Sequence, residues 1–139
     1  MYVFLAWLPL YLMEVHGFSL SKMGLWAAAP WLSLMAVVSC CGYLSDKAIA
    51  AGFSQNLVKT STGAVGILLC ACTLFIATRT ADPMMNVFWL SVALGSLGLT
   101  MSASWSSVIS MGGRFAGSVS GWMNFWGNIG GVLAPSVTA

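Results

Sequence analysis

Near its carboxyl end the chain carries a stripe of amide and small side chains, which is the feature best suited to bind a polar partner. Its members recur at spacings of 4, 3, 4, 3 and 4 and share one helical face: Gly117, Gly121, Asn124, Asn128, Gly131 and Pro135. The opposite face carries Trp122, Trp126, Ile129 and Leu133. Amides donate and accept hydrogen bonds without titrating. Lipid supplies no hydrogen bonds, so we expect this face to be buried against other helices or a wet cavity, and we expect no acid–base chemistry here.

An upstream stretch has a similar face of small and hydroxyl residues, with Trp105 at its border: Gly95, Gly98, Ser102 and Ser106. Glycines permit close helix approach, and serines and asparagines bond across helices. Each residue taken singly is typical of helix packing. The two faces taken together favour a lined substrate path that includes Ser102, Ser106, Asn124 and Asn128.

Residues for other chemistry are missing from the apolar stretches. The sequence has no paired carboxylates, no Ser/His/Asp set and no cluster with metal-ligand spacing. The lone His16 is expected to be a solvated loop residue. Four cysteines fall inside apolar runs, where they are typical packing residues: Cys40, Cys41, Cys70 and Cys72. We expect no enzyme, no catalytic residues, no metal, no cofactor and no disulfide.

The composition identifies the solvent. Of 139 residues, 59% are hydrophobic and only 6% are charged, whereas soluble domains average about 25% charged residues. This number of charged residues is too small to cover a surface that faces water. We therefore expect the chain to lie in a lipid bilayer. The net charge is only +2, and the Lys and Arg residues are scattered along the sequence. Both features argue against a nucleic-acid partner.

The apolar stretches predict an all-α, polytopic transmembrane bundle of about five spans. They cover residues 2–13, 24–44, 60–77, 84–111 and 116–139. A span needs about 20 residues, so the first is short, and the last stops at the chain end. We therefore expect a part of a larger bundle.

Basic residues in the connectors predict the orientation. Lys47, Lys59 and Arg114 fall on one side, and Lys22 and Arg79 on the other. This excess places the loop around Asp46 in the cytoplasm. Asp46 itself is either a solvated helix end or a carboxylate that docks on a neighbouring helix and is released when the bundle moves.

Several motifs in order resemble a known family. YVFLAWLPLYL, HGFSLSKMGLWAAAPWLSL, GYLSD and GRFAGSVSGWMNFWGNIGGVLAP are similar to the second half of the major facilitator superfamily. More narrowly, they resemble its anion:cation symporter family, which includes hexuronate and galactonate transporters, sialin, vesicular glutamate transporters and plastid phosphate transporters. The resemblance implies spans seven to eleven of a twelve-span transporter.

The resemblance also implies roles for residues. Tyr2, Trp105 and Asn124 match positions that face the substrate cavity in relatives. The loop before the last span keeps Arg114 and Gly117 of the family pattern, but carries Ser110 where relatives have Asp and Gly113 where they have Pro. In that scheme Asp46 and Arg114 contribute to gating, and Gly117, Gly121 and Gly131 let the last span slide against its neighbours.

The expected function is transport of an organic or inorganic anion by H⁺- or Na⁺-coupled symport with alternating access. The expected partners are the anion, the coupling ion, the bilayer and the missing amino-terminal half of the same transporter. The plasma (inner) membrane is the expected location, with an organelle membrane as the alternative. The rival hypothesis is a non-transporting multi-span protein, or a degenerate half-transporter with a structural role.

Overall fold

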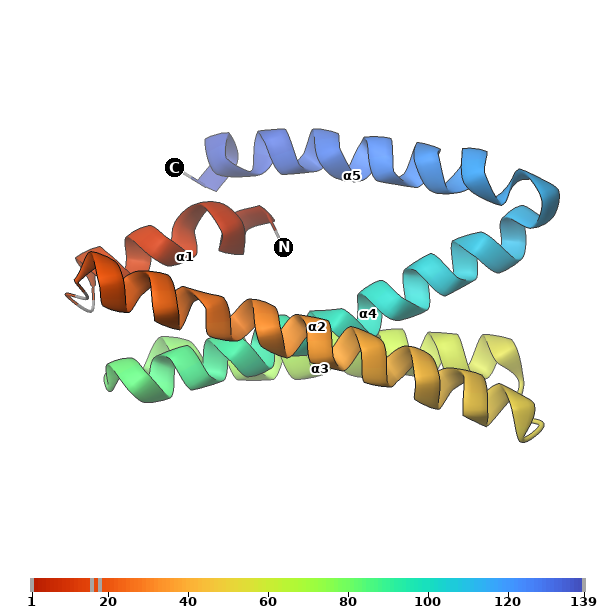
Figure 1. Cartoon of the computed structure of the whole chain (residues 1–139), viewed down its shortest axis with the longest axis horizontal. Coiled ribbons are helices and arrows are strands. Elements are labelled where there is room, and N and C mark those ends of the chain that lie inside the picture. Colours follow the sequence, from red (N-terminus) through yellow and green to blue (C-terminus); the bar gives the residue numbers. More distant parts are fainter. Residues whose placement is uncertain (1, 16, 18, 139) are drawn as a thin grey trace. The chain divides into compact units, whose positions relative to one another are not determined.

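The computed structural model describes residues 2–15, 17 and 19–138, with the backbone alone at 2–6, 135, 136 and 138. This part of the chain is helical throughout apart from short connectors (Figure 1). Its elements are α1 (Tyr2–Glu14), α2 (Leu20–Ala50), α3 (Gln55–Arg79), α4 (Pro83–Gly112), the 3-10 turn η1 (Gly113–Phe115) and α5 (Ala116–Thr138). The all-α prediction is confirmed. His16 lies outside the described residues.

The helices run longer than the apolar stretches. At 31 residues, α2 is about 46 Å long, against an apolar bilayer core of about 30 Å. Asp46 and Lys47, expected where the helix meets a loop, lie inside its last turns. The helix ends where Gly52 takes a positive φ of 98°, with the Phe53 amide donating to the Ala48 carbonyl at 3.2 Å.

The start of α4 is fixed by its first residues. The Asp82 carboxylate accepts hydrogen bonds from the Met84 and Met85 amides at 2.8 and 2.9 Å, which satisfies two of the free amides of the first turn. Pro83 occupies the first helical position, where a missing N–H costs nothing. This turn therefore separates α3 from α4 sharply.

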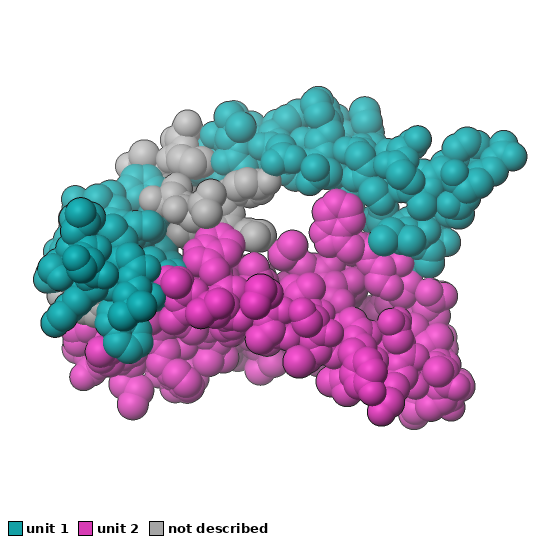
Figure 2. Space-filling view, viewed as in Figure 1, with its two compact units in different colours: residues 1–27, 107–139 teal, residues 28–106 magenta. Residues whose placement is uncertain are grey.

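The chain divides into two compact units, coloured separately in Figure 2. Unit 1 takes in residues up to Ala27 and from Ser107 onward, and unit 2 is Ala28–Ser106. In unit 1, α1 contacts α5, and Leu8, Leu12 and Gly131 are buried.

Unit 2 is a three-helix packing of α2, α3 and α4. The buried residues of α3 recur at helical spacing: Lys59, Gly66, Cys70, Thr73 and Ala77. All but Lys59 are small, so α4 approaches closely. A Cβ placed on Gly66 would lie 2.8 Å from the Ser96 carbonyl oxygen and 2.7 Å from Thr100 Oγ1. The α3–α4 seam therefore leaves no room for a side chain at Gly66.

The outer surfaces of the helices are apolar. Three helical stretches of the described chain are long and apolar enough to cross a membrane: Leu20–Ala50, Gln55–Arg79, and Pro83–Ala134, which includes α4, η1 and most of α5. Large apolar side chains lie on their outsides, among them Leu68, Phe75 and Val132 at 65%, 62% and 76% exposure. Such surfaces suit lipid rather than water.

Candidate functional site

The amide face of α5 is open in the described chain. Gly117, Gly121, Asn124 and Asn128 are exposed, and only Gly131 of the described stripe is buried. The side chain of Pro135 is outside the described set. Burial of this face against another helix or a wet cavity stays a prediction.

The two asparagines of this face differ in their hydrogen bonds. The Asn128 amide donates to the Asn124 carbonyl at 2.8 Å, so part of its donor capacity is used inside the helix. Asn124 makes no side-chain hydrogen bond to any residue that the structure describes. Both Asn124 amide groups are therefore available to an external partner.

Aromatic side chains cover the other side of α5. Trp122, Phe125 and Trp126 form a contiguous cluster, with ring centroids 5.6 to 6.0 Å apart. These rings are 53% to 64% exposed. One of these contacts is stacked and two are edge-on, both of which are favourable arrangements of aromatic rings.

The small face of α4 is divided along its length. Gly95 and Gly98 are buried against α2, where a Cβ on Gly98 would lie 3.2 Å from the Leu34 carbonyl oxygen. Ser102 lies beside Gly42 of α2, with its Oγ 4.0 Å from where a Cβ would stand. Trp105 is half-buried and Ser106 is exposed. The first half of this face is thus a helix contact, and the second half is open.

The expected path residues fall in both units. Ser102, Trp105 and Ser106 belong to unit 2, whereas Asn124 and Asn128 belong to unit 1. Tyr2 lies at the start of α1 in unit 1, and its side chain is not among those described. A common path lined by all of them stays a prediction.

The two charged residues assigned to gating are both exposed. Among the described residues, none pairs with the Asp46 carboxylate. Arg114 lies in η1, with its guanidinium carbon 4.6 Å from the centroid of the Phe115 ring. Gly113, at the position where the resemblance implies proline in relatives, has a φ of +48°. Proline is locked near −65°, so the turn adopted here is one that proline excludes.

The sequence interpretation missed two buried polar residues whose side chains donate hydrogen bonds to a neighbouring helix. Lys59 was counted as a loop residue, but it lies in α3 at 8% exposure, and its Nζ donates to the Ser106 carbonyl at 2.9 Å. Asn86 is 1% exposed and donates to the Ala77 carbonyl at 2.9 Å. Its Oδ1 is buried without a partner among the described residues. Helical spacing could have revealed the burial of Lys59. It lies four residues before Gly63 and seven before Gly66, and these spacings place all three residues on one face of a helix.

The described residues hold no group of three or more His, Cys, Asp or Glu side chains able to ligate a metal. All four cysteines are free thiols. In each unit the expected path residues described above carry hydroxyl, indole or amide groups, which can bind a solute by hydrogen bonds.

Comparison with known proteins identifies the family. The model of the Major Facilitator Superfamily matches residues 1–135. The chain belongs to this superfamily. A probable sulfoacetate transporter of Cupriavidus necator is 33% identical over 99% of the chain, and a D-galactonate transporter of Escherichia coli is 31% identical over 99%. A chloroplastic ascorbate transporter of Arabidopsis thaliana is 28% identical, also over 99%.

The chain spans 32% of the length of each of the two bacterial relatives and 25% of the plant one. The resemblance inferred from the motifs is confirmed at the level of the Major Facilitator Superfamily. With its apolar helices, the chain is a multi-pass integral membrane protein. The relatives are named as transporters rather than enzymes, which agrees with the expectation of a non-enzymatic protein.

Proposed function

We propose that this chain forms part of a secondary active transporter that moves an organic or inorganic anion across a membrane by H⁺- or Na⁺-coupled symport. One observation carries the proposal: relatives aligned over nearly the whole chain are named for anions of unlike chemistry. Their names specify sulfoacetate, D-galactonate, ascorbate and phosphate. A negative charge is what these solutes share. The plasma membrane is the proposed location.

The open amide of Asn124 supports this proposal. An anion that leaves water needs hydrogen-bond donors in place of its hydration shell. Asn124 offers an N–H₂ group that no described residue occupies, and Trp105 offers an indole N–H on a rigid ring. Alternating access about a midplane site is the mechanism we propose, as in other transporters built from two halves.

We assign the coupling group to another part of the transporter. The acidic residues of this chain, Glu14, Asp46 and Asp82, all lie at or near helix ends. Coupling carboxylates normally lie within spans, facing the bundle interior. We also propose that Asp46, unpaired among the described residues, docks on a helix of the other half in one state, with Arg114 gating the same side. Gly117, Gly121 and Gly131 would let α5 slide.

The test is uptake by the intact protein, as its gene encodes it, in proteoliposomes. Labelled sulfoacetate, galactonate, ascorbate and phosphate are offered under an inward H⁺ or Na⁺ gradient, with glucose as the uncharged control. At least one anion should accumulate above equilibrium and leak out when an ionophore collapses the gradient. Folded, monodisperse protein that takes up none of them would favour the non-transporting rival.

A further inference from the structure

The α3–α4 seam is held by a repeated kind of bond, in which a side chain on one helix donates to a backbone carbonyl on the other. Asn86 Nδ2 donates to the Ala77 carbonyl at 2.9 Å at one end, and Thr100 Oγ1 donates to the Gly63 carbonyl at 3.2 Å farther along. Lys59 Nζ donates to the Ser106 carbonyl at 2.9 Å at the other end. The two helices are therefore joined along most of their length in one antiparallel register.

The Lys59 bond differs from the other two because its donor is charged. Removing an ammonium from water is costly unless it gains strong partners. At 8% exposure, Lys59 depends on such partners, and the Ser106 carbonyl has a second lone pair to offer besides the one used within α4. Hydrogen bonds to charged groups are the stronger class. Lys59 therefore fixes this end of the seam more firmly than a neutral residue would.

The carbonyl that Lys59 holds lies next to Trp105. Successive residues of a helix point about 100° apart, so fixing the Ser106 carbonyl also fixes the direction in which the Trp105 side chain leaves the helix. We propose that Lys59 is a positioning residue for transport, whose ammonium sets the rotation of α4 at which Trp105 and Ser106 face the substrate path. This inference rests on the proposed function for the path, while the placement of α4 by Lys59 is independent of it.

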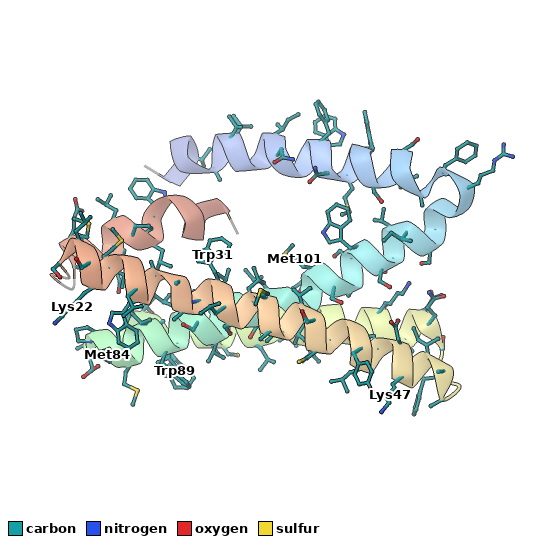
Figure 3. The ribbon with its side chains drawn as sticks, in the orientation of Figure 1. Lys22, Trp31, Lys47, Met84, Trp89 and Met101 are labelled. Atoms are coloured by element: carbon teal, nitrogen blue, oxygen red, sulfur yellow. The ribbon has the colours of Figure 1, made fainter. Side chains whose placement is uncertain are left out.

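Kinetics provide the first test. Lys59→Met in the intact protein removes the ammonium and keeps an unbranched side chain that is one atom shorter. The kcat/KM for uptake per inserted molecule should fall by about tenfold or more. Lys59→Arg keeps donors at this position and should recover part of the loss. The matched control is Lys47→Met, which removes an exposed lysine that points away from the ribbon (Figure 3). The Lys47 Nζ lies 5.1 Å from the centroid of the Tyr43 ring. The kcat/KM of this variant should stay near wild type.

A disulfide across the seam gives a readout that needs no transport. A Cβ on Gly63 would lie 3.7 Å from the Ala103 Cβ, within the range that disulfides require. Gly63→Cys with Ala103→Cys, in a background whose native cysteines are replaced by alanine, should cross-link readily on mild oxidation. Adding Lys59→Met should slow the cross-link by up to about tenfold, whereas Lys47→Met should not.

The outcomes separate the two hypotheses. An unchanged cross-linking rate in Lys59→Met would overturn the role of Lys59, whatever the uptake shows. A slower cross-link in a protein that transports none of the anions would mean that Lys59 holds α4 against α3 but has no role in transport. That outcome would also reject the proposed function. Slower cross-linking with unchanged kcat/KM per inserted molecule would reject the positioning role and make Lys59 purely structural.

Discussion

Asn124 and Asn128 carry the same amide on the same face of α5, and their hydrogen bonds distinguish them. Asn128 already donates to the Asn124 carbonyl at 2.8 Å, while the Asn124 side chain bonds no described residue. An anion that replaces water on this face gains more from the uncommitted amide. Exposure does not separate the two, because both are exposed.

We predict that Asn124→Ala lowers the kcat/KM of anion uptake by about tenfold, the effect of one hydrogen bond to a charged group. Asn128→Ala removes the same atoms and should lower it by less than about threefold, because its donor is partly used within the helix. The measurement is initial uptake rate per inserted molecule, with the membrane content checked by immunoblot. Wild-type uptake by Asn124→Ala would contradict the assignment of this residue.

At the scale of the element, the seam between α3 and α4 depends on the absence of a side chain at Gly66. A Cβ there would meet the Ser96 carbonyl oxygen at 2.8 Å and Leu99 Cβ at 2.9 Å, and a backbone atom cannot move aside as a flexible side chain can. We predict that Gly66→Ala destabilises the protein by about 1–3 kcal/mol through overpacking.

The measurement is the thermal unfolding midpoint of the intact protein in detergent. The control is Gly24→Ala on α2, where a Cβ would meet nothing within 4 Å and alanine favours the helix by about 0.5–1 kcal/mol. Gly24→Ala should unfold at the wild-type midpoint or slightly above it. Equal midpoints for the two variants would show that α3 and α4 are not packed in this register.

Sequence patterns were sufficient to predict where the helices lie in the chain, but not which surfaces they pack against. In the described part of the chain each run of apolar residues corresponds to one α-helix, because lipid leaves a chain few other ways to satisfy its backbone hydrogen bonds. They failed at the ends of the helices. There Asp46 continues α2, because Lys47, Ile49 and three alanines, none of which breaks a helix, follow before Gly52 ends it. Lys59 was assigned to a loop because its positive charge was given more weight than its helical spacing from Gly63 and Gly66. The neighbour of the α5 amide face was not predictable, because helical periodicity identifies a face of a helix but not what packs against it.

At the scale of the whole molecule, the predicted orientation in the membrane depends on whether the buried Lys59 counts toward its side of the membrane. Without it, Lys47 and Arg114 on one side balance Lys22 and Arg79 on the other. Lysines act on orientation during insertion, according to their distance from the ends of spans. Lys59 lies in the second turn of α3, so it still counts toward its side, even though the folded protein buries it against α4. The excess therefore favours a cytoplasmic connector between α2 and α3.

We predict that Ser54 lies in the cytoplasm and Ala81 on the opposite side. Both are exposed and flank α3, whose 25 residues span about 37 Å, enough to cross the bilayer. In a background without native cysteines, a membrane-impermeant maleimide should label Ala81→Cys in intact cells and Ser54→Cys only after permeabilisation. The reverse pattern would invert the topology and move Asp46 and Arg114 to the other face. Labelling of both from outside would mean that α3 does not cross the membrane.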